Sequence, residues 1–222
     1  MLDLNTEAFI PELVNILKDK VHNKTQKFII KTPVRDSISF AEYKNKFDKV
    51  MNYIKAGDCY QINLSKKFVV DTEGDSWQFY KKFRDINKSP FMAYLLYDDF
   101  DILSGSPERF IKVKDGIVST RPIKGTKARG KDKFLDQKNA DELSNSIKDQ
   151  SENLMIVDLL RNDLSMNCKI GSVKVDELFS IESYPNVHHL VSTISGVLDN
   201  KSSNFKLFND SFPGGSITGA PK

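Results

Sequence analysis

The dipeptide Asp115-Gly116 constrains the fold of this chain more than any other feature, because it is a strong signal for a two-residue turn. The segments on either side, RFIKVK and IVSTRP, alternate apolar and polar residues as strands do. The sequence therefore predicts a β-hairpin within residues 104–126. Folding at the turn brings the outer ends together, so we expect Glu108 and Lys124, sixteen positions apart, to face one pocket as an acid and a nucleophile.

Apolar periodicity predicts the remaining elements. The apolar spacing indicates helices at 7–20, 39–57, 76–87, 141–163 and 204–212. Capping signals mark both ends of the second helix, with Ser39 at its start and Gly57 at its end. Strand patterns occur in FIIKTP, CYQINLSKKFVV, FMAYLLY, DFDILSG, SVKVDELFSIES and VHHLVSTISGVL. The Lys- and Arg-rich segment 124–133 lacks apolar anchors, which predicts a mobile exposed loop. Antiparallel strands interrupted by helices predict an α+β fold with helices packed on sheets.

The charge balance and cysteine content exclude several classes of protein. A net charge of +3 over 222 residues is too small to indicate nucleic-acid binding. The two cysteines, Cys59 and Cys168, lie far apart without metal-site spacing, which favours a reducing compartment. No segment has the composition of a signal peptide or the length to cross a bilayer, so we expect a cytoplasmic protein without a membrane partner.

Each of the two hairpin residues also has a plain structural interpretation. Glu108 would ordinarily be an exposed carboxylate paired with Arg109 or Arg121, and Lys124 an ordinary surface lysine. A lysine becomes nucleophilic when desolvation or neighbouring cations favour its neutral form. The proline and glycine setting of Lys124, in RPIKGT, fixes the backbone and removes bulk beside the amine.

Acidic residues on the segment IKDQSENLMIVDLLRND are candidates for binding a cation. Glu152 and Asp158, with Asp149 and Asp163 nearby, offer oxygen ligands of the kind that Mg²⁺ prefers. The alternative is a helix with scattered solvated acids that form ordinary ion pairs.

The pair His188-His189 lies on a predicted strand, where neighbouring side chains point to opposite faces. At most one of them can face a site. A lone histidine on a strand is more often a packed, hydrogen-bonded residue than a catalyst.

The final segment, GGSITGAPK, has two glycines at the spacing of a phosphate-binding loop, Gly214 and Gly219. Ala220 stands where that loop requires lysine, so the nucleotide interpretation fails. A glycine-rich turn with several free N–H groups still suits a small anion such as a carboxylate.

Six segments, taken together and in order, resemble the chorismate-utilising enzymes: GDCYQINLSKKF, LSGSPERF, TRPIKGT, KDQSENLMIVDLLRND, HHLVSTISG and FPGGSITGAPK. This resemblance covers the chain from about Gly57 to Lys222. It implies that family's layered α/β architecture, with two large antiparallel sheets and packed helices. Residues 1–222 would then form one chorismate-binding domain fragment, with 1–56 ending an N-terminal region and 57–222 forming a catalytic core.

Two positions choose among the branches of the family. Enzymes that add water to chorismate carry a lysine where this chain has Gln61, which argues against isochorismate and salicylate synthases. Anthranilate synthases usually carry alanine where this chain has Lys124, whereas lysine there marks the aminodeoxychorismate synthases.

The resemblance also implies a role for each matching residue. Lys124 would attack C2 of chorismate while Glu108 protonates the departing C4 hydroxyl, and Glu152 would bind a magnesium ion. The residues that would contact the substrate are Gln61, His189, Gly215, Ser216, Thr218, Gly219 and Lys222. Asp158, Arg161, Asn162 and Asp163 would support the site.

The family's two-component arrangement implies a glutamine amidotransferase partner that supplies ammonia. Family members continue past the GAPK motif and begin with a longer N-terminal region, so we expect these 222 residues to be a truncated, inactive portion of such an enzyme. Two alternatives remain open. One is an anthranilate synthase component I, and the other is a non-catalytic subunit that binds chorismate or a partner.

Overall fold

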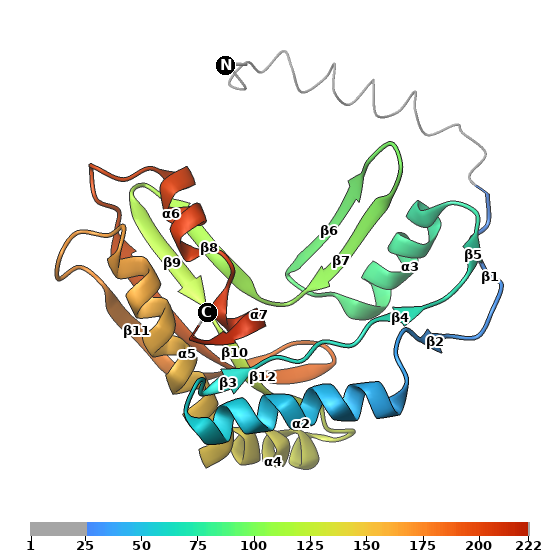
Figure 1. The fold of residues 1–222 in the computed structure, drawn as a ribbon, viewed down its shortest axis with the longest axis horizontal. Helices are drawn as coiled ribbons and strands as arrows, with labels where there is room; N and C mark the ends of the chain where they lie inside the picture. The colour runs from blue at the N-terminus through green and yellow to red at the C-terminus, as the bar shows by residue number, and fades with distance from the viewer. Residues whose placement is uncertain (1–25, 222) are drawn as a thin grey trace.

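The computed structural model describes residues 26–221, and its largest sheet has five antiparallel strands (Figure 1). The strands are β8 (Arg109–Lys114), β9 (Ile117–Arg121), β10 (Ile123–Ala128), β11 (Lys174–Ser183) and β12 (Val187–Val197). The predicted α+β class is confirmed. The described residues also form four two-stranded ladders, which are separate from this sheet.

Strand β12 is the centre of the sheet. It pairs with β11 along its length and, by separate segments, with β9 and β10. Pro122 separates β9 from β10, and β8 pairs only with β9. Glu108, which directly precedes β8, therefore lies close to the point where β9 gives way to β10.

Two long helices cover the sheet, α4 (Lys133–Ser144) and α5 (Ile147–Ser165). The buried residues of α5 recur every three or four positions and define the face that meets β12: Asn153, Ile156, Val157, Leu160, Asp163 and Leu164. The apolar core lies between this face, the sheet and α6 (Asn204–Ser211), and it includes Val118, Ile194 and Leu207.

The other strands form small ladders around the sheet. Strand β6 (Phe91–Leu96) pairs with β7 (Asp101–Ser106), beside α3 (Ser76–Asn87), and Figure 1 shows this unit standing apart from α5 and α6. The remaining ladders join β1 (Ile29–Ile30) to β5 (Thr72–Glu73), β2 (Arg35–Asp36) to β4 (Phe68–Val69), and β3 (Gln61–Ile62) to β13 (Gly219–Ala220).

Local signals fixed the ends of helix α2 (Phe40–Ala56) as predicted. Ser39 and Glu42 form the reciprocal capping box, and Gly57 ends the helix with a left-handed φ of 82°. The apolar face of α2 does not pack into a core, because none of its residues is buried and Phe47 is 46% exposed.

Three expectations about local structure were wrong in part. Segment 59–70 forms two short strands rather than one, because its ends pair with different partners, β13 and β2. Segment 124–133 is not a loop, because 124–128 pairs with β12. The helix expected at 141–163 is two helices, divided where Asn145 leaves helical geometry and Ser146 caps α5.

Pairing with β12 and two ion pairs stabilise segment 124–133, although its sequence lacks apolar anchors. Lys127 forms an ion pair with Glu142, and Arg129 forms one with Asp136 at 2.6 Å, so the charges are satisfied outside the ladder. The helix expected at 7–20 lies outside the described residues. Among helices within residues 26–221, none is both long and apolar enough to cross a bilayer.

Candidate active site

The hairpin around Asp115-Gly116 forms as expected. Both turn residues have positive φ, 51° and 74°, as a two-residue turn of the primed type requires. Arg109 is opposite Arg121, so Glu108 enters the sheet at the level of Pro122.

Glu108 is held at the start of β8 by backbone and side-chain contacts. Its N–H donates to Ser106 Oγ at 3.2 Å, and its carboxylate Oε1 accepts a hydrogen bond from the N–H of Ile123 at 3.2 Å. The acid is thereby fixed against the residue that precedes Lys124. No ion pair joins Glu108 to an arginine or to Lys124 within residues 26–221, which disfavours the surface-pair interpretation.

Lys124 lies on β10 and is partly buried. Its Nζ donates to the backbone carbonyl of Ser216 at 2.8 Å, rather than to a carboxylate. Gly125 follows with a φ of 90°, and a Cβ there would lie 2.9 Å from both Asp149 Cβ and Leu143 Cδ1. Glycine therefore allows this strand to approach α4 and α5 closely, which fixes the base of the lysine side chain.

The glycine-rich segment has more structure than the predicted open turn. Residues Gly215–Thr218 form a single helical turn, α7, and Gly219–Ala220 continue as β13. The N–H groups of Ile217 and Thr218 are already used, since both donate to the carbonyl of Gly214. Fewer amides are therefore free to receive an anion than the sequence indicated.

Two polar atoms of predicted substrate-binding residues are buried without a partner among the described residues: Ser216 Oγ and Gln61 Oε1. Ser216 is 9% exposed, so water does not readily satisfy its hydroxyl. Buried polar groups in folded proteins are normally hydrogen-bonded, and such exceptions often mark functional positions. Gln61 lies on β3, and Ser216 lies on α7, which leads directly into β13, the partner of β3.

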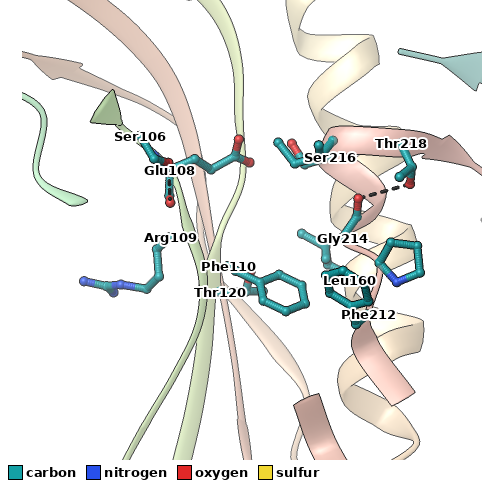
Figure 2. A pocket seen from close by; sticks show the side chains of 12 residues that line it. Ser106, Glu108, Arg109, Phe110, Thr120, Leu160, Phe212, Gly214, Ser216 and Thr218 are labelled. Atoms are coloured by element: carbon teal, nitrogen blue, oxygen red, sulfur yellow. Dashed lines mark hydrogen bonds between the residues drawn. The ribbon is translucent and has the colours of Figure 1, made fainter. Parts of the chain in front are cut away.

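A cavity of about 410 Å³ is lined by both Glu108 and Ser216, whereas Gln61 and Lys124 are not among its lining residues (Figure 2). In Figure 2 the Glu108 side chain points toward Ser216 across it. Its polar lining includes Ser106, Thr120 and Thr218, and its apolar lining includes Phe110, Leu160, Phe212, Pro213 and Ile217. Apolar walls with a few directed polar groups are typical of small-molecule sites.

Sequence reasoning did not identify the aromatic wall of this cavity. Phe110 could have been found, because it lies two residues after Glu108 on a strand and so shares its face. Phe212 and Leu160 could not, since only tertiary packing brings α5 and the end of α6 to this place.

His189 lies outside this cavity. It is 7% exposed, exchanges a hydrogen bond with Thr126 Oγ1 at 2.9 Å, and lines a second cavity of about 230 Å³ with Asn87 and Tyr184. Burial lowers the pKa of His189 below the ordinary histidine value, which favours the neutral ring. His188 has different partners, Asp136 and Ser183.

Glu152 lies on α5 with its side chain 40% exposed, and its nearest charged partner is Lys148 at 3.8 Å. No group of three His, Cys, Asp or Glu residues that could hold a metal occurs within residues 26–221. Glu152 thus offers one carboxylate, which suits an ion that takes one or two protein carboxylates with water and substrate. Asp158, whose side chain is 81% exposed, pairs with Arg161 at 3.3 Å, which is the ordinary ion pair of the alternative interpretation, and Lys222 lies outside the described residues.

Comparison with known proteins identifies relatives that match most of this chain. The family described as "chorismate binding enzyme" matches residues 7–222. "Aminodeoxychorismate synthase component 1" of Salmonella typhimurium is 48% identical over 204 residues, which cover 89% of this chain and 45% of that protein. The protein of the same name from Escherichia coli K12 is 45% identical over 206 residues, covering 93% of this chain and 46% of that protein. The chain thus spans about half the length of the curated relatives that it matches.

The fold has a counterpart among solved structures. Anthranilate synthase component I from Streptococcus pneumoniae TIGR4 superposes with a TM-score of 0.79 at 25% sequence identity. The match covers 98% of this chain and 49% of that one. The α+β arrangement expected from the six motifs is therefore that of an anthranilate synthase component I.

Proposed function

The chain belongs to the chorismate binding enzymes, and on this premise we propose that its protein is the chorismate-aminating component of an aminodeoxychorismate synthase. The observation that carries the proposal is the position of Lys124. Its amine bonds a neutral carbonyl, while the preceding residue bonds the carboxylate of Glu108. Two relatives of that name are 48% and 45% identical, against 41% for the anthranilate synthase component 1 of Saccharolobus solfataricus, and this difference supports the aminodeoxychorismate branch.

The reaction begins with a covalent step. The neutral Lys124 amine attacks C2 of chorismate, the ring double bonds shift, and the C4–O bond breaks. Glu108 gives its proton to the leaving hydroxyl, which departs as water, and the new secondary amine loses one proton.

Ammonia completes the exchange. Its nitrogen forms a bond to C4, the double bonds shift back, and the C2–N bond to Lys124 breaks. A proton returns to the lysine nitrogen. The net change is chorismate plus ammonia giving 4-amino-4-deoxychorismate plus water, with no oxidation or reduction. Such a product serves as a precursor of 4-aminobenzoate and folate.

The unpartnered polar atoms of Ser216 and Gln61 support a role in holding the substrate, with Gly215, Thr218, Gly219 and Lys222 as further contacts. His189, although it lines the second cavity, would contact the substrate ring from that side. Glu152 would bind a Mg²⁺ ion, which would supply positive charge for a substrate carboxylate. The word "component" in the relatives' names supports a partner subunit, for which we propose a glutamine amidotransferase that supplies ammonia.

The proposal is tested in a version of the protein as long as its relatives. Purified protein is incubated with chorismate, an ammonium salt and Mg²⁺, and products are separated by chromatography. We expect 4-amino-4-deoxychorismate from the parent and none from Lys124→Ala. Lys127→Ala, on the same strand but paired with Glu142 at the surface, is the matched control and should retain activity.

Other outcomes separate the alternatives. Fluorescent anthranilate as the product would assign the protein to the other aminating branch. Heat of chorismate binding without turnover would instead indicate a non-catalytic binding subunit. If Lys124→Ala formed aminodeoxychorismate at the parent rate, the covalent role would have to be abandoned.

A further inference from the structure

We propose that Asn63 is a positioning residue that holds the Lys124 amine and the Gln61 side chain in their working orientations. This inference rests on the proposed function, since it concerns the nucleophile of that reaction. Neither its residue type nor its spacing singled out Asn63 in the sequence.

The carbonyl oxygen of Ser216 is the point at which Asn63 and Lys124 meet. Asn63 Nδ2 donates to this oxygen at 2.9 Å, and Lys124 Nζ donates to it at 2.8 Å. A carbonyl oxygen has two lone pairs, and these two donors use both of them. Moving the Asn63 amide therefore moves the acceptor that holds the lysine.

Gln61 fixes which way the Asn63 amide faces. Gln61 Nε2 donates to Asn63 Oδ1 at 3.3 Å, so the Asn63 oxygen is occupied and its NH₂ group is directed at Ser216. In the same arrangement the other atom of the Gln61 amide, Oε1, stays buried and unpartnered among the described residues. Asn63 thus orients the Gln61 amide through its Oδ1, and through its Nδ2 it orients the Ser216 carbonyl that accepts from Lys124.

The backbone of this segment is fastened to the glycine-rich segment. Asn63 N–H donates to the carbonyl of Thr218 at 2.9 Å, and Tyr60 N–H donates to that of Ala220 at 2.8 Å. Between them, Ile62 pairs with Gly219 in the β3–β13 ladder. A Cβ on Gly219 would lie 2.1 Å from the Gln61 carbonyl oxygen, so the two segments cannot approach as closely with any other residue.

The chemistry of the donor explains why an amide suits this position. Asn63 is neutral, so it orients the Ser216 carbonyl without placing a negative charge beside the lysine. A carboxylate at the same position would attract the ammonium form of Lys124, which is not nucleophilic. It would also oppose the Ser216 carbonyl with a second acceptor.

The test uses Asn63→Ala and the isosteric Asn63→Asp in the version as long as the relatives, with two readouts. The first is the split between kcat and KM for formation of aminodeoxychorismate. The second is the rate at which trace acetic anhydride acetylates Lys124 at neutral pH, measured by peptide mass spectrometry. Asn139→Ala is the matched control, because Asn139 also donates its amide to a backbone carbonyl, that of Ala128 at 2.9 Å, away from the cavity.

We expect Asn63→Ala to lower kcat about tenfold, as loss of one positioning hydrogen bond does, with KM for chorismate nearly unchanged. Asn63→Asp should also slow the acetylation of Lys124 about tenfold, because a neighbouring carboxylate favours the charged amine. Asn139→Ala should change neither readout. Thermal unfolding of each variant verifies that Asn63→Asp retains the fold.

Unchanged acetylation in Asn63→Asp would overturn the proposal, and so would a parent-like kcat in both Asn63 variants. A different result separates the proposal from its premise. If acetylation responds to Asn63 but the parent makes no aminodeoxychorismate, the coupling between Asn63 and Lys124 stands and the proposed function fails.

Discussion

The carboxylate of Glu108 and the backbone N–H of Ile123 are hydrogen-bonded at 3.2 Å across the open end of the hairpin. The contact fixes the acid against the peptide that leads into Lys124, without an ion pair between the two side chains. The distance between Glu108 and Lys124, which we propose as acid and nucleophile, is therefore set by the sheet rather than by an attraction between the two side chains.

Glu108→Gln tests the acid without removing this contact. The amide oxygen of glutamine can still accept from Ile123 N–H, but the side chain no longer carries a proton to donate. We expect kcat for chorismate amination to fall about 100-fold or more, with thermal unfolding unchanged. Glu142→Gln, at a surface ion pair, is the control. A Glu108→Gln enzyme with parent kcat would show that another group protonates the hydroxyl.

Gly125→Ala tests the close approach beneath Lys124. The left-handed φ costs alanine about 1–2 kcal/mol of unfolding free energy, and the contacts with Asp149 and Leu143 cost about 1–3 kcal/mol more. Gly116→Ala, with a φ of 74° and open space around it, should show only the first cost. Urea unfolding of both variants measures the difference, and equal losses would contradict the steric argument.

Short-range chemistry made part of the fold predictable. The Asp115-Gly116 turn and the Ser39–Glu42 capping box each depend on residues within a few positions, so the sequence contains all of the information they need. The strand at 124–128 depends instead on pairing with β12, sixty residues away, and on acids that neutralise Lys127 and Arg129. The lysines and arginine of this segment are visible in the local sequence, but the strand and the acidic residues that pair with them are distant in the sequence or assigned only by the fold.

The same distinction applies to the candidate site. The closeness of Glu108 to Ile123, the residue before Lys124, was predictable because one turn brings these segments together, although Lys124 does not line the cavity that Glu108 lines. The contact between Lys124 and Ser216 joins residues 92 positions apart, and it depends on the tertiary placement of α7, which precedes the β13 strand that pairs with β3. The sequence did not indicate Asn63 as a site residue, because its contacts with Ser216 and Thr218 also depend on tertiary packing.

Asp136→Asn should change the dependence of stability on pH. The pKa of Asp136 is held far below its usual value by hydrogen bonds from Arg129, from the N–H of Gly130 and from His188. A carboxyl with a depressed folded-state pKa contributes stability above its unfolded value, about 3.9, and loses it as the pH falls. The parent's free energy of unfolding should therefore drop between pH 5 and 3, and that of Asp136→Asn should drop less. Urea unfolding across this range checks it, with Asp99→Asn, an exposed turn residue, as the control.

Asn153→Ala tests how α5 is fixed against the sheet. Asn153 is fully buried, accepts a hydrogen bond from Ser192 Oγ at 2.5 Å, and donates to the Leu190 carbonyl at 3.4 Å. Alanine would leave both groups of β12 buried without these partners, so we expect a loss of about 1–3 kcal/mol in unfolding free energy. Ser151→Ala is the control, because its hydroxyl bonds the Ile147 carbonyl on the exposed side of the same helix.

Because Glu152 adjoins Asn153 on α5, the same substitution should also weaken the binding of Mg²⁺ that we propose for Glu152. A loosened helix would place the Glu152 carboxylate less reproducibly, so a higher Mg²⁺ concentration should be needed for half-maximal amination in the version as long as the relatives. A double-mutant cycle with Ser192→Ala isolates the contribution of the Asn153–Ser192 bond. Loss of stability without any change in Mg²⁺ requirement would show that Glu152 either does not bind the ion or is held by its own contacts.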